Sequence, residues 1–105
     1  MNLFIPASRS RLFDFRIEWK YLTRPLLEGR IKQWVTKKIH EFVGDDEPEL
    51  ITFILTLIEK KDRPRKILDE IKQVLDKEAE GFVIKLWRLI IYETEARRVG
   101  LSSKE

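Results

Sequence analysis

The sequence predicts an all-α protein: a compact four-helix bundle with an N-terminal arm that is extended or short-helical. Apolar residues recur at helical spacing through four successive segments, and proline, glycine or aspartate stands between one segment and the next. No segment alternates polar and apolar residues as a half-buried strand does. Amphipathic helices joined by short loops bury their apolar faces against one another, and a bundle is the arrangement that does so.

The chain of 105 residues has room for one domain with a short extension at either end. We expect an arm over residues 1–23, the helical bundle over residues 24–99 and a disordered tail over residues 100–105. A domain of this size buries enough surface for one modest core.

The arm begins without any sustained periodicity, so residues 1–17 are predicted to be extended. Leu12, Phe13 and Phe15 are nevertheless too apolar for a free tail. We therefore expect part of the arm to pack against the bundle, and residues 18–22 to form a short helical turn.

The first two helices are predicted over residues 24–43 and 47–61. Gly44 follows the first helix as a residue that can end it in the left-handed conformation. Pro48 stands near the first position of the second helix, and the acidic residues before it favour a helix N-terminus. The second helix is apolar on nearly every side, so we expect it to be the most enclosed of the four.

The third helix is predicted over residues 64–76, with Pro64 at its start and one apolar stripe along its length. Asp76 is expected to cap a fourth helix, which runs to about Arg98 before Gly100.

The composition excludes several classes of protein. Charged residues make up 37 % of the chain, well above the usual quarter or so. The absence of cysteine excludes a disulfide framework and a thiolate zinc site, and makes a reducing compartment such as the cytosol or the nucleus the default. No apolar run approaches the roughly 20 residues of a membrane span, so we expect no membrane contact.

Nothing in the sequence has the pattern of an active site. His40 is the only histidine and projects opposite the apolar stripe of its helix, where we expect a surface residue. The acidic residues 45–49 lack the ligand spacing and the glycine of a calcium loop, and no glycine-rich phosphate loop is present. We therefore predict a protein that is not an enzyme, with no catalytic residues, no metal and no cofactor.

Trp34 lies among four cations in the segment RIKQWVTKKI. Its ring is either an exposed platform on which a base stacks or a core residue with charged neighbours. On a helical wheel with Arg30 at 0°, Trp34 falls at about 40°, inside the apolar arc. We therefore predict a core or half-core tryptophan, and the same for Trp87. Lys38, at about 80° on the same wheel, also lies in the arc. It either snorkels or pairs with an acid of another helix, or it is a cation held beside a binding surface.

Basic residues gather in three regions: the arm, the first helix and the loop at residues 60–66. Between them, residues 41–59 carry six acids and no Lys or Arg. Three basic regions favour a phosphate-binding surface, which would depend on backbone charge and weaken as salt rises. Charge alone marks the following loop residues as candidates: Lys60, Lys61, Arg63, Arg65 and Lys66.

The order of these segments resembles the PWI domain, a four-helix module of nuclear pre-mRNA processing proteins. Residues 33–35, Gln-Trp-Val, stand at the Pro-Trp-Ile tripeptide that names the family, and residues 37–39 and 42–44 continue its pattern. Residues 82–87 are similar to the Phe and Leu-Trp pattern of its last helix. The glutamine in place of proline removes a helix-start marker and favours a continuous helix from about Leu26.

The resemblance implies binding to the backbone of RNA or DNA with little sequence preference, through the motif-linked cations Arg30, Lys37 and Lys38. It also implies a role in mRNA splicing in the nucleus, and we expect a monomer. The alternative is a protein-interaction scaffold within the spliceosome or the U1 snRNP, in which contact with RNA is incidental. The acidic residues 41–49 and the apolar arm at residues 12–22 would then matter most.

Overall fold

The computed structural model describes residues 5–45 and 47–100. The elements are α1 (Arg9–Asp14), the 3-10 turn η1 (Trp19–Tyr21), α2 (Arg24–Leu26), the π-helical turn η2 (Leu27–Ile31), α3 (Lys32–Val43), α4 (Pro48–Glu59), α5 (Pro64–Leu75), the 3-10 turn η3 (Asp76–Glu78) and α6 (Ala79–Arg98). The described ranges contain no strand, and the predicted all-α bundle is confirmed. The predicted disordered tail falls almost wholly on residues 101–105, which lie outside the described ranges.

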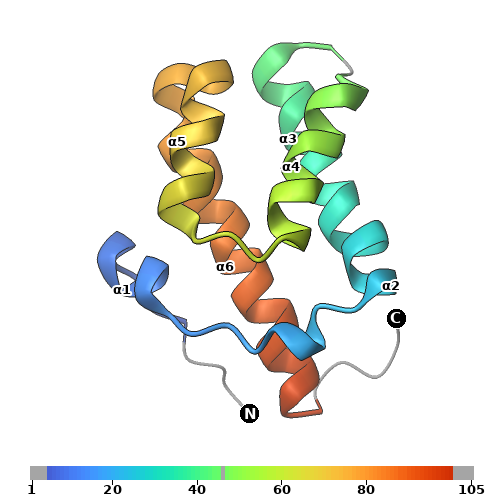
Figure 1. Ribbon diagram of the computed structural model, residues 1–105, viewed down its shortest axis with the longest axis vertical. Helices are drawn as coiled ribbons and strands as arrows, with labels where there is room; N and C mark the ends of the chain where they lie inside the picture. Colours follow the sequence, from blue (N-terminus) through green and yellow to red (C-terminus); the bar gives the residue numbers. More distant parts are fainter. Residues whose placement is uncertain (1–4, 46, 101–105) are drawn as a thin grey trace.

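Four long helices form the bundle, and α6 lies at its centre (Figure 1). α6 contacts α5, α1 and η1, whereas α4 contacts α3 and α5. The arm crosses one end of the bundle, and the loop between α4 and α5 lies above it in the view of Figure 1.

The most enclosed helix is α6 and not α4, so that prediction was wrong. α4 buries four of its 12 residues, and its Phe53 remains 40 % exposed. α6 buries ten of its 20, including Phe82 and Trp87. The reason is position in the bundle: neighbours surround α6, and one side of α4 faces outward despite its apolar residues.

The prediction that Asp76 caps the fourth helix was also wrong. Asp76 ends α5 with a φ of 55° and a ψ of −125° and begins η3. α6 starts only at Ala79, after Glu78, whose side chain makes no capping hydrogen bond. The chain therefore turns through a strained residue and one 3-10 turn instead of passing directly from helix to helix.

The predicted helix over residues 24–43 is confirmed as one helical path, interrupted by a single π-helical turn at η2. It begins where the Thr23 hydroxyl accepts a hydrogen bond from the amide of Leu26. It ends at Gly44, whose φ of 82° places it in the left-handed region.

The arm is more ordered than its lack of periodicity suggested. Residues 9–14 form a short helix because Ser8 caps it, accepting a hydrogen bond from the amide of Arg11 at 3.3 Å. Leu12 and Phe13 from this helix, with Ile17 after it, are buried in the core of the bundle. The arm is thus part of the packed domain, and it carries its own cations to a fixed place on the surface.

Candidate nucleic-acid interface

The loop between α4 and α5 is built on an unusual lysine. The amide of Lys61 donates to the carbonyl of Ile58 at 2.9 Å, and the amide of Asp62 donates to that of Leu57 at 3.4 Å. This pair of bonds is the Schellman ending of a helix, in which the left-handed residue is usually glycine. Here that residue is Lys61, with a φ of 61°. The left-handed backbone at this position is less favourable for a lysine than it would be for a glycine.

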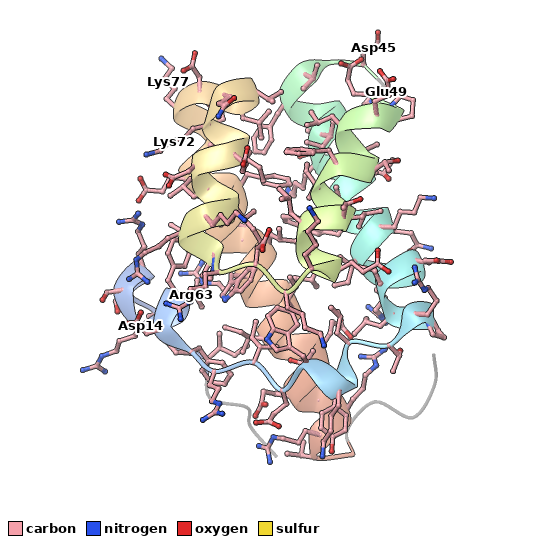
Figure 2. All side chains as sticks on the ribbon, viewed as in Figure 1. Asp14, Asp45, Glu49, Arg63, Lys72 and Lys77 are labelled. Carbon is pink, nitrogen blue, oxygen red and sulfur yellow. The ribbon has the colours of Figure 1, made fainter. Side chains whose placement is uncertain are left out.

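The arm and this loop together form a hollow of about 630 Å³. Its basic lining comes from both segments: Arg16 from the arm, and Lys61, Arg63 and Arg65 from the loop and the start of α5. In Figure 2, Arg63 and Asp14 lie near each other where α1 meets the start of α5. The fold thus joins two of the three basic regions seen in the sequence.

The cations around the hollow differ in their partners. Arg65 pairs with Asp14 at 3.0 Å and lies over the ring of Phe13, 5.7 Å from its centroid, so it fastens α1 to α5. Arg16, Lys61 and Arg63 make no ion pair within the described part of the chain. Their charges are therefore available to an external anion.

The start of α5 adds to the positive potential. Arg63 precedes Pro64, the first residue of this helix, and Arg65 and Lys66 lie in its first turn, which contains no acid. Cations here are repelled by the partial positive charge of the helix N-terminus, whereas an anion would be attracted by both. Lys66 is partly balanced by Asp62, whose carboxylate lies 3.7 Å from its amine.

The predicted cations of the first helix lie elsewhere, and two of them have partners. Arg30, in η2, is 3.6 Å from the carboxylate of Glu93 on α6, and its side chain is 68 % exposed. Lys38 is 3.3 Å from Glu41, one turn along its own helix. Lys37 is exposed on α3. None of the three lines the hollow, and neither do Lys60 and Lys66 of the loop set.

The aromatic residues beside the hollow form a second feature. Trp19 meets Trp87 edge to face, with 6.1 Å between the ring centroids. Trp19 and Phe15 are half-buried and line the hollow, whereas Trp87 is buried and borders it from within. Trp87 Nε1 and one carboxylate oxygen of Asp62, Oδ2, are both buried without a hydrogen-bond partner.

Comparison with known proteins agrees with this architecture. The profile of the PWI domain matches residues 29–98, more than half of the chain. The chain belongs to the PWI domain family.

Three relatives extend the similarity beyond the profile. RNA-binding protein 25 of Homo sapiens is 42 % identical over 97 residues, covering 92 % of this chain and 12 % of that protein. RNA-binding motif protein 25 of Arabidopsis thaliana is 33 % identical over 100 residues, covering 95 % and 11 %. U1 snRNP-associated protein usp107 of Schizosaccharomyces pombe is 33 % identical over 96 residues, covering 88 % and 14 %. The chain thus spans between 11 % and 14 % of the length of these relatives.

In this PWI domain two residues of the name-giving tripeptide pack in the core, and the third, Gln33, is exposed. Trp34 is half-buried against Phe82, with 5.4 Å between the ring centroids, and Val35 is fully buried. The prediction of a half-core Trp34 and a core Trp87 is confirmed. Lys38 retains 23 % exposure of its side chain, and its acid partner comes from α3 itself and not from another helix.

The role of Glu93 was not predicted from the sequence. This residue is buried on α6, where its carboxylate accepts from the guanidinium of Arg97 at 2.7 Å, with both side chains less than a tenth exposed. A signal for it was present, since Glu93 follows Leu86 by seven residues, about two helical turns, and so lies on the apolar stripe. Arg16 and Trp19 were missed as well, and no local signal marks them, because their place beside the loop depends on the path of the arm.

Other kinds of site find no support in the described ranges. Residues 5–45 and 47–100 contain no group of three His, Asp or Glu side chains placed to hold a metal ion. No helix within them is both long and apolar enough to cross a bilayer. His40 is exposed, as its place on the wheel predicted.

Proposed function

We infer that this PWI domain binds RNA through its phosphates, as a non-catalytic, monomeric module of a nuclear pre-mRNA splicing factor. The observation that carries this proposal is the meeting of Arg16 from the arm with Lys61, Arg63 and Arg65 around one hollow. The names of the relatives support it, since two are called RNA-binding and one U1 snRNP-associated.

The geometry fits phosphate contact without base-specific recognition by a helix. Three of the four cations have no acid partner in the described ranges, and the N-terminus of α5 adds its dipole beside them. Binding of this kind releases counterions, so the logarithm of the affinity falls linearly with the logarithm of salt concentration, with a slope of about 0.7 per phosphate contact on a single strand. The same surface accepts the backbone of DNA, which carries the same charges.

A matched pair of charge reversals tests the proposal. Lys61→Glu with Arg63→Glu should weaken binding of a labelled single-stranded RNA at 50 mM salt at least tenfold, a loss of about 1.4 kcal/mol. Lys72→Glu with Lys77→Glu makes the same change of charge at the other end of α5 (Figure 2) and should weaken binding less than threefold. Fluorescence anisotropy measures both.

The result that contradicts the proposal is an equal effect of the two pairs, or no binding by the parent domain at 50 mM salt. Equal effects would mean that net charge, and not this surface, attracts the RNA. Circular dichroism of each double variant establishes that the helices remain intact.

A protein-interaction scaffold is the second candidate, favoured by one observation at the opposite end of the bundle. Val43 and Phe53 remain 42 % and 40 % exposed on α3 and α4, near Asp45 in the turn after α3 and Glu49 in the first turn of α4 (Figure 2). An apolar surface with acidic neighbours suits a basic protein segment. A pull-down from nuclear extract with nuclease added separates the two functions, because partners bridged by RNA are lost and directly bound proteins are retained.

A further inference from the structure

The hollow between the arm and the α4–α5 loop has features that phosphate binding alone does not require. The aromatic side chains of Phe15 and Trp19 line it beside the cations. Trp87 and Asp62 also line it, and the indole nitrogen of Trp87 and Oδ2 of Asp62 lack hydrogen-bond partners although both atoms are buried. Buried polar atoms are nearly always paired in folded proteins, so two unpaired atoms in residues that line one hollow need an explanation.

The chemistry of these atoms indicates what would pair them. The indole N–H of Trp87 only donates, and the carboxylate oxygen of Asp62 only accepts. An occupant that reaches both atoms must offer an acceptor and a donor close together. The edge of a nucleobase does so, and its flat face can also stack on an aromatic side chain such as Trp19.

The charges favour the same occupant. Arg16 lies on the arm side of the hollow, and Lys61 and Arg63 lie on the loop side. None of the three has an acid partner in the described ranges, so both sides can hold a phosphate. A single strand carries a phosphate on each side of every base, which matches cations on two sides of one hollow. The volume, about 630 Å³, lies within the range of small-ligand sites.

We propose that this hollow receives one unpaired nucleotide of a single-stranded RNA, with the base beside Trp19 and its two phosphates at the cations of the arm and the loop. Trp87 Nε1 and Asp62 Oδ2 are closed to solvent in the free domain, and they pair with the edge of that base once the side chains that line the hollow move apart. The proposal rests on the proposed function and adds a preference: a duplex keeps its bases stacked inside and contacts only the rim. Single strands therefore bind more tightly than duplexes of equal charge.

The first experiment uses the parent domain and needs no variant. A ten-nucleotide single-stranded RNA with a central 2-aminopurine is titrated with protein, and the same strand is titrated as a duplex. We expect the fluorescence of 2-aminopurine to change by at least twofold in the single strand and by less than a fifth in the duplex, because only the unpaired base leaves its neighbours to stack on protein. Binding of both strands with no change in either would overturn this inference and leave the proposed function standing.

The second experiment compares two tryptophans. Trp19→Leu removes the ring beside the hollow, and Trp34→Leu removes a half-buried ring that packs on Phe82 instead. We expect Trp19→Leu to weaken single-stranded RNA at least fivefold and the duplex less than twofold, and Trp34→Leu to change the ratio of the two affinities less than twofold. An equal loss for single strand and duplex in Trp19→Leu would contradict the site.

A third titration separates a nucleotide from other anions. Inorganic polyphosphate and a poly-glutamate peptide, each matched to the RNA in charge, compete against the 2-aminopurine strand. We expect both to need at least a fivefold higher concentration than unlabelled single-stranded RNA. Equal competition by polyphosphate would reduce the hollow to a phosphate site, and equal or better competition by poly-glutamate would assign it to an acidic peptide. Each of those results overturns the inference.

Discussion

Two basic regions of this domain look alike in the sequence but differ in structure. In the first helix, Arg30 lies near Glu93 and Lys38 near Glu41, so acids within the domain partly satisfy these cations. In the α4–α5 loop, Lys61 and Arg63 have no acid partner in the described ranges. The first region contributes to holding helices together, and the second offers its charge to the outside.

The partners of a cation separate a structural role from a functional one. A cation that pairs with a buried acid stabilises the fold, because without it the acid would be a buried charge with one partner fewer. A cation held in a left-handed residue, as Lys61 is, or before the N-terminus of a helix, as Arg63 is, opposes the local preference of the backbone. Violations of local rules concentrate at functional sites, which favours the loop as the binding region.

The largest expected effect is on stability, and it comes from breaking the buried ion pair of Glu93 with Arg97, since Glu93 is also the acid near Arg30. Glu93→Gln removes the carboxylate next to the guanidinium of Arg97, whose side chain is 7 % exposed. Loss of one partner of a buried ion pair costs about 3 kcal/mol, and we expect that decrease in the free energy of unfolding. Urea denaturation followed by circular dichroism measures it.

The matched control is Glu95→Gln on the same helix. Glu95 pairs with Arg98 at 2.8 Å, but the Arg98 side chain is 46 % exposed, so we expect a loss of about 1 kcal/mol or less. Equal losses for the two variants would mean that burial of Glu93 adds nothing to the free energy of unfolding. The acids of the first region would then have no special structural role.

Sequence reasoning was strongest where one helix could be judged by itself. Proline at the start of α4 and α5 and glycine at the end of α3 marked boundaries that the structure confirms within one or two residues. It failed where the answer depended on neighbours. The apolar pattern of α4 could not indicate that one side would face outward. The helix α1 in the arm could not be predicted, because its six residues are too few for a periodic pattern.

The candidate site shows the same division. Charge alone marked Lys61, Arg63 and Arg65, which do line one hollow. Arg16 and Trp19 come from a segment more than forty residues earlier, and only the packing of Leu12 and Phe13 into the core brings that segment to the loop. No periodicity within the arm contains this information, because the contact is made between segments.

An intermediate effect is expected in the salt dependence of RNA binding. Lys61→Gln with Arg63→Gln removes two phosphate contacts, so the slope of log affinity against log salt should fall by about 1.4 on a single strand. Arg30→Gln with Lys38→Gln removes the same charge from the first region and should leave the slope within about 0.3, because those cations lie near acids of the domain. Titrations at four salt concentrations measure both slopes.

If the Arg30 and Lys38 pair lowers the slope as much as the loop pair, the comparison between the regions is broken. The RNA would then cover both faces, as the resemblance to the family implied. If the loop pair alone lowers it, the binding region is confined to the arm and the loop.

The smallest effect separates folding from function within one residue. Lys61→Gly places glycine at a φ of 61° and removes the strain of a side chain there, so the domain should gain roughly 0.5–1 kcal/mol once the greater freedom of glycine in the unfolded chain is subtracted. Because a phosphate contact is lost, the salt slope for single-stranded RNA should fall by about 0.7 in the same variant. Thermal unfolding and anisotropy measure the two quantities on one sample. If the variant gains stability and keeps its RNA affinity, Lys61 is not part of the binding surface. If it loses stability, the lysine stem contributes more to packing of the loop than the left-handed backbone costs. Higher stability together with weaker binding is the result expected of a residue retained for a ligand at the expense of the fold.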